Sequence, residues 1–103
     1  MSDTPHRSAE GGALTAAQKK ALMHRLARIE GQLRGVQKLL ALAEQPSDCE
    51  AVAQQMTAAR KALDRAFVQL LTSGMQTQSA NARDLGEARA SASRLAAMLD
   101  KFL

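Results

Sequence analysis

Apolar residues recur along the chain with the seven-residue spacing of packed α-helices. From residue 22 to 43 the intervals between apolar positions alternate between four and three, and the same alternation returns from residue 52 to 70. This periodicity predicts two long helices whose apolar stripes pack against one another. The stripes consist of Leu22, Leu26, Ile29, Leu33, Val36, Leu40 and Ala43, and of Val52, Met56, Ala59, Leu63, Ala66 and Leu70, widened by Phe67 and Leu71.

Residues with capping preferences predict where the first helix begins and ends. Thr15 and Gln18 have the spacing of a capping box, in which each side chain bonds to a free backbone N–H of the other residue. We therefore expect the helix to begin at Thr15. The dipeptide Gln45-Pro46 ends it near Glu44, because proline disfavours the helical conformation of the residue before it.

The same signals predict a second helix and a shorter third one. Ser47 and Glu50 have the capping-box spacing and predict the start of the second helix, which we expect to end between Ser73 and Gln78. Asn81 is the expected N-cap of the third helix. That helix has an apolar stripe of Leu85, Ala88, Ala92, Leu95, Leu99 and Phe102.

These elements predict an all-α protomer, a long antiparallel hairpin of two helices followed by a short C-terminal helix. Residues 1–13 lack periodicity and are expected to form a flexible tail, and residues 14–103 a single helical domain. A hairpin of this size leaves much of its apolar stripe in water. We therefore predict an obligate oligomer in which two hairpins share a four-helix bundle.

Composition agrees with an all-α fold and narrows the cellular context. There are 21 Ala and 14 Leu but only three Val, one Ile and two Phe, which favours helices over strands. No apolar run approaches the roughly 18 residues of a membrane span. The N-terminus lacks the apolar segment of a secretory signal. A single cysteine, Cys49, excludes an intrachain disulfide, so we expect a cytoplasmic protein.

The positive charge is concentrated in one half of the chain. Residues 19–65 hold nine basic and five acidic groups, which is the entire net charge of +4. Helical geometry places many of these basic groups opposite the apolar stripe or beside it, together with His24, Gly31 and Gly35. Two glycines inside a helix cost about 1 kcal/mol each relative to alanine, and the close approach of another backbone would offset that cost. The basic residues concerned are Lys20, Arg28, Arg34, Lys38, Lys61 and Arg65, with Arg60 at the margin of the stripe.

A basic face with small residues suits contact with phosphates, but the same pattern also occurs on the solvated face of a structural bundle. The aromatic residues expected for stacking on single strands are absent, and no helix-turn-helix pattern is present. No nucleophile–base pair or phosphate-binding glycine loop is recognisable, so we do not expect an enzyme.

The stretch from Arg25 to Val36 resembles the opening signature of the copper-sensing operon repressors and of their nickel/cobalt- and formaldehyde-responsive relatives. Asp48-Cys49 and the stretch from Gln54 to Arg65 resemble the second helix of that family. The resemblance implies an all-helical homodimer, usually paired into a homotetramer, that binds double-stranded operator DNA and is released by a small effector at the dimer interface. Together with the charge map it gives the expected DNA-contacting residues, Lys20, Arg25, Arg28, Arg34, Lys38, Arg60, Lys61 and Arg65.

The resemblance also places the effector site at Cys49, but with an altered set of metal ligands. The copper sensors have a His and a second Cys further along this helix, where Gly74 and Gln78 stand here. Neither Gly74 nor Gln78 can serve as a soft ligand. Of the three ligand positions of the copper sensors, a transition metal would therefore find a ligand only at Cys49. An N-terminal His serves as a ligand in some nickel-type relatives, which leaves His6 and His24 as alternatives.

Cys49 has three further interpretations. It could sense an aldehyde, an electrophile or a sulfur species by covalent change. It could share a metal with a second copy across the dimer. It could also be a small core residue, in a protein that binds DNA constitutively or serves as a partner-binding helical bundle.

Overall fold

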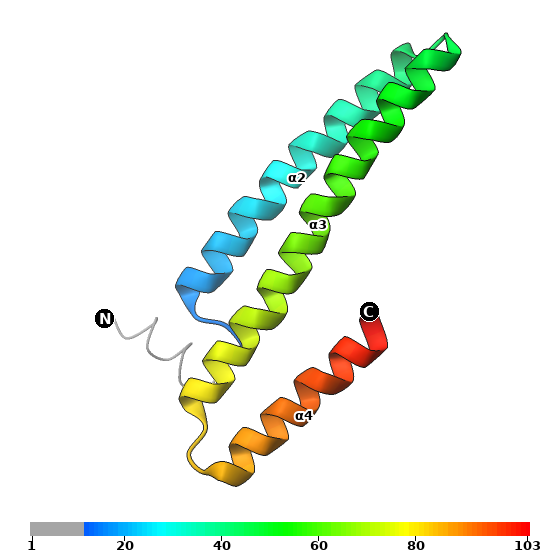
Figure 1. Ribbon diagram of the computed structural model, residues 1–103. Helices are drawn as coiled ribbons and strands as arrows, with labels where there is room; N and C mark the ends of the chain where they lie inside the picture. The colour runs from blue at the N-terminus through cyan, green and yellow to red at the C-terminus, as the bar shows by residue number, and fades with distance from the viewer. Residues whose placement is uncertain (1–11) are drawn as a thin grey trace. The chain divides into compact units, whose positions relative to one another are not determined.

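The computed structural model describes residues 12–103 as three α-helices joined by short turns (Figure 1). They are α2 (Ala16–Leu42), α3 (Pro46–Asn81) and α4 (Leu85–Phe102). The predicted all-α, three-helix protomer is confirmed. Almost all of the predicted tail, residues 1–13, lies outside the described residues. None of the helices within residues 12–103 is long and apolar enough to cross a membrane.

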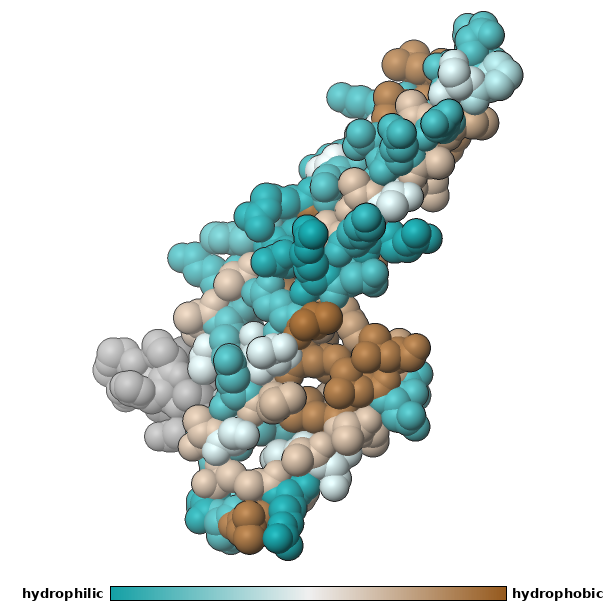
Figure 2. Space-filling view, in the orientation of Figure 1, coloured by the Kyte–Doolittle hydropathy of each residue, from teal (hydrophilic) through white to brown (hydrophobic). Residues whose placement is uncertain are grey.

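The described residues form two compact units. The hairpin unit, residues 21–68, holds most of α2 and the first two thirds of α3. The terminal unit holds residues 12–20 and 69–103, and therefore the first turn of α2, the end of α3 and α4. In Figure 2 apolar side chains gather along α4, whereas most of the visible hairpin surface is hydrophilic.

The core of the hairpin unit contains five of the predicted apolar stripe positions, well under half of those in this unit. Its buried positions are spaced by seven residues on each helix, and they are Ile29 and Val36 on α2 and Val52, Ala59 and Ala66 on α3. The positions between them remain in water, because small residues such as alanine bring the helices together without covering the flanking side chains. Three large apolar residues are about half exposed, namely Leu33 (49%), Met56 (56%) and Leu63 (52%).

The capping box at the start of α2 is confirmed, and it also joins α2 to α3. The Thr15 N–H donates to Gln18 Oε1 at 2.8 Å, and the Gln18 N–H donates to Thr15 Oγ1 at 3.0 Å. The Gln18 amide additionally donates to the Ser73 carbonyl at 3.3 Å and accepts a 2.6 Å bond from the Thr77 hydroxyl. Thr77 is 4% exposed, so this capping residue satisfies a buried hydroxyl on another helix.

The predicted cap at the start of α3 is wrong. The helix begins at Pro46, before the expected Ser47 cap. Proline is favoured at the first helical position, because its missing N–H would have no partner there. The carboxylate of Asp48, and not the side chain of Glu50, reaches back to accept bonds from the backbone N–H groups of Glu44 (3.0 Å) and Gln45 (2.9 Å). These bonds lower the pKa of Asp48 from its ordinary value of 3.8.

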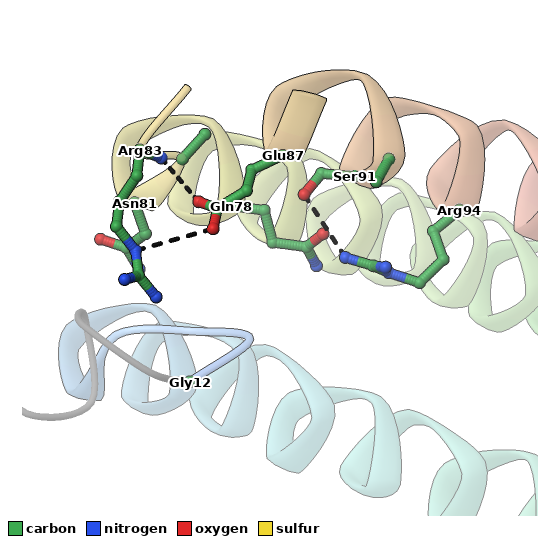
Figure 3. Close-up of a pocket in the computed structure, with 9 residues that line it drawn as sticks. Gly12, Gln78, Asn81, Arg83, Glu87, Ser91 and Arg94 are labelled. Carbon is green, nitrogen blue, oxygen red and sulfur yellow. Dashed lines mark hydrogen bonds and ion pairs between the residues drawn. The ribbon is translucent and has the colours of Figure 1, made fainter. Parts of the chain in front are cut away.

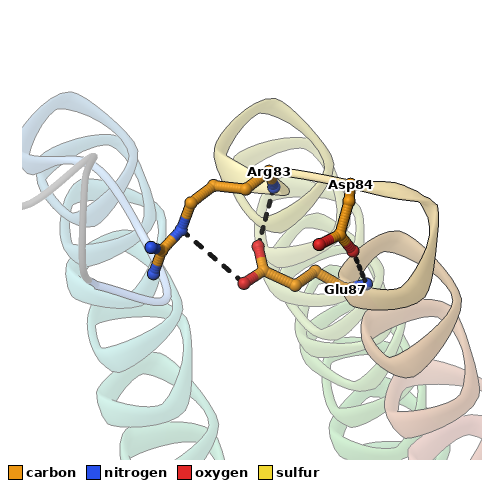
Figure 4. A network of polar contacts seen from close by, with 3 residues as sticks. All are labelled: Arg83, Asp84 and Glu87. Atoms are coloured by element: carbon orange, nitrogen blue, oxygen red, sulfur yellow. Dashed lines mark hydrogen bonds and ion pairs between the residues drawn. The ribbon is translucent and has the colours of Figure 1, made fainter.

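The predicted junction between the last two helices is also wrong. α3 continues through Ser73 and Gln78 to Asn81, and Asp84 is the N-cap of α4 in place of Asn81. The Asp84 carboxylate accepts from the Glu87 N–H at 2.8 Å, and the Glu87 carboxylate accepts from the Arg83 N–H at 2.7 Å (Figure 4). An Asp with a Glu three residues later satisfies more free N–H groups than Asn81 could, and this decides where α4 begins.

The link between α2 and α3 can be tested with Thr77→Val, which keeps the shape of the side chain but removes its hydroxyl. We expect the free energy of unfolding to fall by about 1 kcal/mol, the usual worth of one hydrogen bond. Urea denaturation followed by circular dichroism measures it. The matched control is Thr57→Val, because the Thr57 hydroxyl donates only to Ala53 of its own helix. Equal effects of the two substitutions would show that the Thr77–Gln18 bond contributes nothing between helices.

Candidate nucleic-acid interface

Three predicted DNA-contacting arginines converge on one groove of the hairpin unit. Arg25 and Arg28 come from α2 and Arg65 from α3, and together they line a cleft of about 610 Å³. The side chains of Ile29, Gln32 and Ala62 and the Cα of Gly31 complete its lining. We call this cleft the basic groove. It is wide open to solvent along one side, as a surface that receives a polymer must be.

The guanidinium groups of the basic groove have no acidic partner. No carboxylate lines the groove. Within residues 12–103 the one ion pair is between Arg83 and Glu87, at 3.6 Å, in the terminal unit. Guanidinium groups without a carboxylate keep all their donors for a ligand, and their planar fork matches phosphate oxygens in bidentate geometry. The basic groove can therefore bind a polyanion without first breaking internal ion pairs.

The other expected DNA contacts do not line this groove. Arg60 lines a different cleft, an apolar groove of about 220 Å³ that it shares with the exposed Leu33, Met56 and Leu63. Four further basic residues are exposed and line neither groove. They are Lys20, which belongs to the terminal unit, and Arg34, Lys38 and Lys61 of the hairpin unit.

Neither glycine of α2 is explained by packing within the chain. A Cβ atom built on Gly31 or on Gly35 would meet nothing within 4 Å. An alanine would therefore fit at both positions, and the helix would gain stability from it. The two positions differ in one respect, because Gly31 lines the basic groove and Gly35 does not.

A model of the metal-sensitive transcriptional repressor family matches residues 18–101, which is nearly all of the described chain. The chain belongs to this family. The family is one of transcription regulators, which is not a class of enzyme. No individual curated protein and no solved structure matched the chain significantly.

Cys49 lies in the first turn of α3 and is exposed. The neighbouring Asp48 holds the turn before it through the two backbone hydrogen bonds described above. The thiol is thus presented at the surface from a rigid helix start. The structure contradicts the interpretation of Cys49 as a core residue within one chain.

The residues around Cys49 do not form the metal site that the family name leads one to expect. Within residues 12–103 no three His, Cys, Asp or Glu side chains lie close enough to hold a metal ion. Gly74 and Gln78 occupy the same helix as Cys49, 25 and 29 residues further along. At 1.5 Å per residue, 25 residues of helix correspond to roughly 38 Å, so one chain cannot bring these positions to a shared ligand. His24 is exposed on α2, and His6 lies outside the described residues.

Sequence reasoning found the arginines of the basic groove but missed its uncharged lining. Gln32 and Ala62 carry no charge, and their place in the groove depends on the rotation of α2 against α3. The burial of Thr77 was missed as well, because the end of α3 was predicted too early. A longer α3 would have placed Thr77 on the same face as Ser73 and Ala66.

Proposed function

We propose that this repressor binds double-stranded operator DNA through the basic groove. The observation that carries the proposal is the convergence of Arg25, Arg28 and Arg65 on one cleft without a carboxylate. Arg34, Lys38, Lys61 and Lys20 are exposed, and they extend the contact to neighbouring phosphates. Such contacts are mostly electrostatic, so DNA affinity falls steeply with salt concentration. DNA shape supplies part of the sequence preference.

The DNA-binding form is a homodimer, paired into a homotetramer. Support comes from the exposed side of the apolar stripe, where Leu33, Met56 and Leu63 flank an apolar groove in each chain. Side chains of this size are rarely left in water along a whole helix pair, and a second hairpin would cover them in a four-helix bundle. Arg60 lies at the rim of that groove. In the dimer its aliphatic stem lies along the interface and its guanidinium stays in water, so Arg60 is not a principal DNA contact. A cytoplasmic location follows from binding operator DNA.

We assign the release of DNA to chemical modification or ligation of Cys49. Two observations support this assignment. The Cys49 thiol is exposed at the start of α3, and the resemblance to the repressor family places the effector site at this cysteine. The ligand set of one chain does not fit a metal ion, so no step of the release is assigned to one. Among the candidate effectors, an aldehyde and a sulfur species need only the thiol itself.

The groove is tested by fluorescence anisotropy with a duplex from upstream of the chain's own coding region and a scrambled duplex as the competitor. Arg65→Ala should weaken specific binding and reduce the slope of log affinity against log salt by about 0.9 for each phosphate that it no longer neutralises. The matched control is Arg94→Ala, which removes an exposed arginine of α4.

An unchanged salt slope in Arg65→Ala would overturn the role of the groove. If the unaltered protein shows no preference for the upstream duplex over the scrambled one, that region holds no operator. If it binds neither duplex at moderate salt, the partner-binding bundle becomes the better interpretation.

The two glycines give a second, independent test. Gly31→Ala and Gly35→Ala should each raise the free energy of unfolding by about 1 kcal/mol, since both positions have room for a methyl group. Only Gly31→Ala should weaken DNA binding, because only this methyl group enters the basic groove. Equal DNA affinities for the two variants would mean that the DNA backbone does not approach α2 at Gly31.

Cys49→Ala should bind DNA as the unaltered protein does but should no longer be released. The measurement repeats the anisotropy titration after exposure to formaldehyde, a persulfide donor, Cu(I) or Ni(II). Release that persists in the variant would place sensing elsewhere in the chain. If none of these agents releases even the unaltered protein, a constitutive DNA binder is favoured.

A further inference from the structure

The helix α4 has two apolar faces, and the chain covers only one of them. On the covered face Leu95 is 4% exposed, and its neighbours Ala88 and Met98 are partly covered. A second row of residues runs along the adjacent side of the helix, with alternating intervals of four and three, and all of its members are exposed. We call this row the α4 stripe, and it consists of Leu85, Arg89, Ala92, Ala96, Leu99 and Leu103.

The α4 stripe borders an apolar groove of about 260 Å³ in the terminal unit. Met75 and Ser79 of α3 line one side of this groove, and three members of the stripe, Ala92, Ala96 and Leu99, line the other. Met75 itself is 46% exposed. In Figure 2 the apolar surface of this unit follows α4. Because alanines occupy the middle of the stripe, a second helix can approach closely there.

The α4 stripe has nearly the same pattern when it is read in either direction. Large residues stand toward both ends, with Ala92 and Ala96 in the middle. Two α4 helices can therefore lie antiparallel about a two-fold axis midway between these alanines. Leu85 of one copy then lies beside Leu103 of the second copy, and the alanines meet where the helices cross. A self-complementary surface of this kind is what a two-fold contact requires.

Arg89 and Asp100 give the antiparallel arrangement its charge complementarity. Both are exposed, and within residues 12–103 neither forms an ion pair. In the antiparallel register Arg89 lies beside Leu99 of the second copy, directly next to Asp100 of that copy. The aliphatic stem of the arginine can cover the leucine while its guanidinium reaches the carboxylate. The two-fold axis repeats this ion pair, whereas a parallel arrangement would place Arg89 against Arg89.

We propose that the α4 stripe is a contact between two copies of this chain, in which the α4 helices lie antiparallel and Arg89 of each copy pairs with Asp100 of the other. α4 has 18 residues and is roughly 27 Å long. One helix pair of this length buries less than the roughly 1,600 Å² of a standard stable interface. The contact therefore joins dimers that have already formed, twice in each tetramer, and in this respect it rests on the hairpin dimer of the proposed function.

Sedimentation-velocity ultracentrifugation of the full chain, over a series of protein concentrations, tests the contact by charge exchange. Arg89→Asp and Asp100→Arg each replace two attractions per contact with two repulsions. Each should raise the dissociation constant of the tetramer into dimers at least about tenfold. The double variant restores opposite charges in exchanged places and should return the constant close to that of the unaltered protein. Circular dichroism should show unchanged helicity in all three variants, because both side chains are exposed.

The matched control is Arg94→Asp, which makes the same change of charge on the opposite side of α4. The Arg94 guanidinium points away from the α4 stripe, and its Nη2 lies 3.4 Å from the Ser91 hydroxyl (Figure 3). This substitution should leave the dissociation constant of the tetramer unchanged. An effect equal to that of Arg89→Asp would mean that the net charge of the chain, and not the α4 contact, sets the assembly.

The sizes of the species separate this contact from the hairpin dimer. If the hairpins do not pair but the α4 helices do, the unaltered protein is a dimer that Arg89→Asp converts into monomers. A tetramer or dimer that neither Arg89→Asp nor Asp100→Arg weakens contradicts the α4 contact alone. An unaltered protein that stays monomeric at every concentration overturns both contacts.

Discussion

The organisation of this repressor depends on an apolar stripe that one chain can bury only in part. On both helices of the hairpin unit, every seventh residue packs inside and the residues between remain half in water. Val36 and Ala59 are examples of the first set, and Leu33 and Leu63 of the second. Since small buried residues bring α2 and α3 close, the hairpin unit has little core of its own. If a second hairpin covers the exposed part of the stripe, as proposed, stability and assembly are coupled, as in other bundles built from shared stripes.

A second constraint is electrostatic. The arginines of the basic groove lie on the same two helices as the apolar stripe, yet the chain gives them no carboxylate, while Arg83 in the terminal unit has one in Glu87. Arginine without a partner keeps a positive potential at the surface, which repels like charges and lowers the stability of the free protein slightly. The arrangement is understandable if a phosphate backbone supplies the missing counter-charge. Under the proposed function, the two faces of the hairpin have two different partners, a second hairpin and DNA.

The sequence predicted the three helices well, because they depend on local spacing, whereas the DNA-contacting role of the arginines stays a prediction. The seven-residue repeat and the capping box of Thr15 with Gln18 can be recognised from residues close together in the sequence, without knowing how the rest of the chain folds. The end of α3 could not be predicted in the same way, since no proline or glycine cap marks it and Asn81 and Asp84 compete as caps. The convergence of Arg25 with Arg65 depends on how α2 and α3 rotate against one another, which periodicity leaves open.

The uncovered glycines have a consequence for motion. Gly31 and Gly35 lie in the middle of a 27-residue helix, with no side chain and nothing within 4 Å of where a Cβ atom would stand. Backbone hydrogen bonds open most easily where packing and helix propensity are both weak, so amide protons around residues 31–35 should exchange with solvent sooner than those around the buried Ala59 of α3. α2 is therefore most compliant along the surface that carries its arginines. In the proposed DNA complex, a compliant stretch of α2 would let the hairpin follow grooves of slightly different width, as recognition of DNA shape requires.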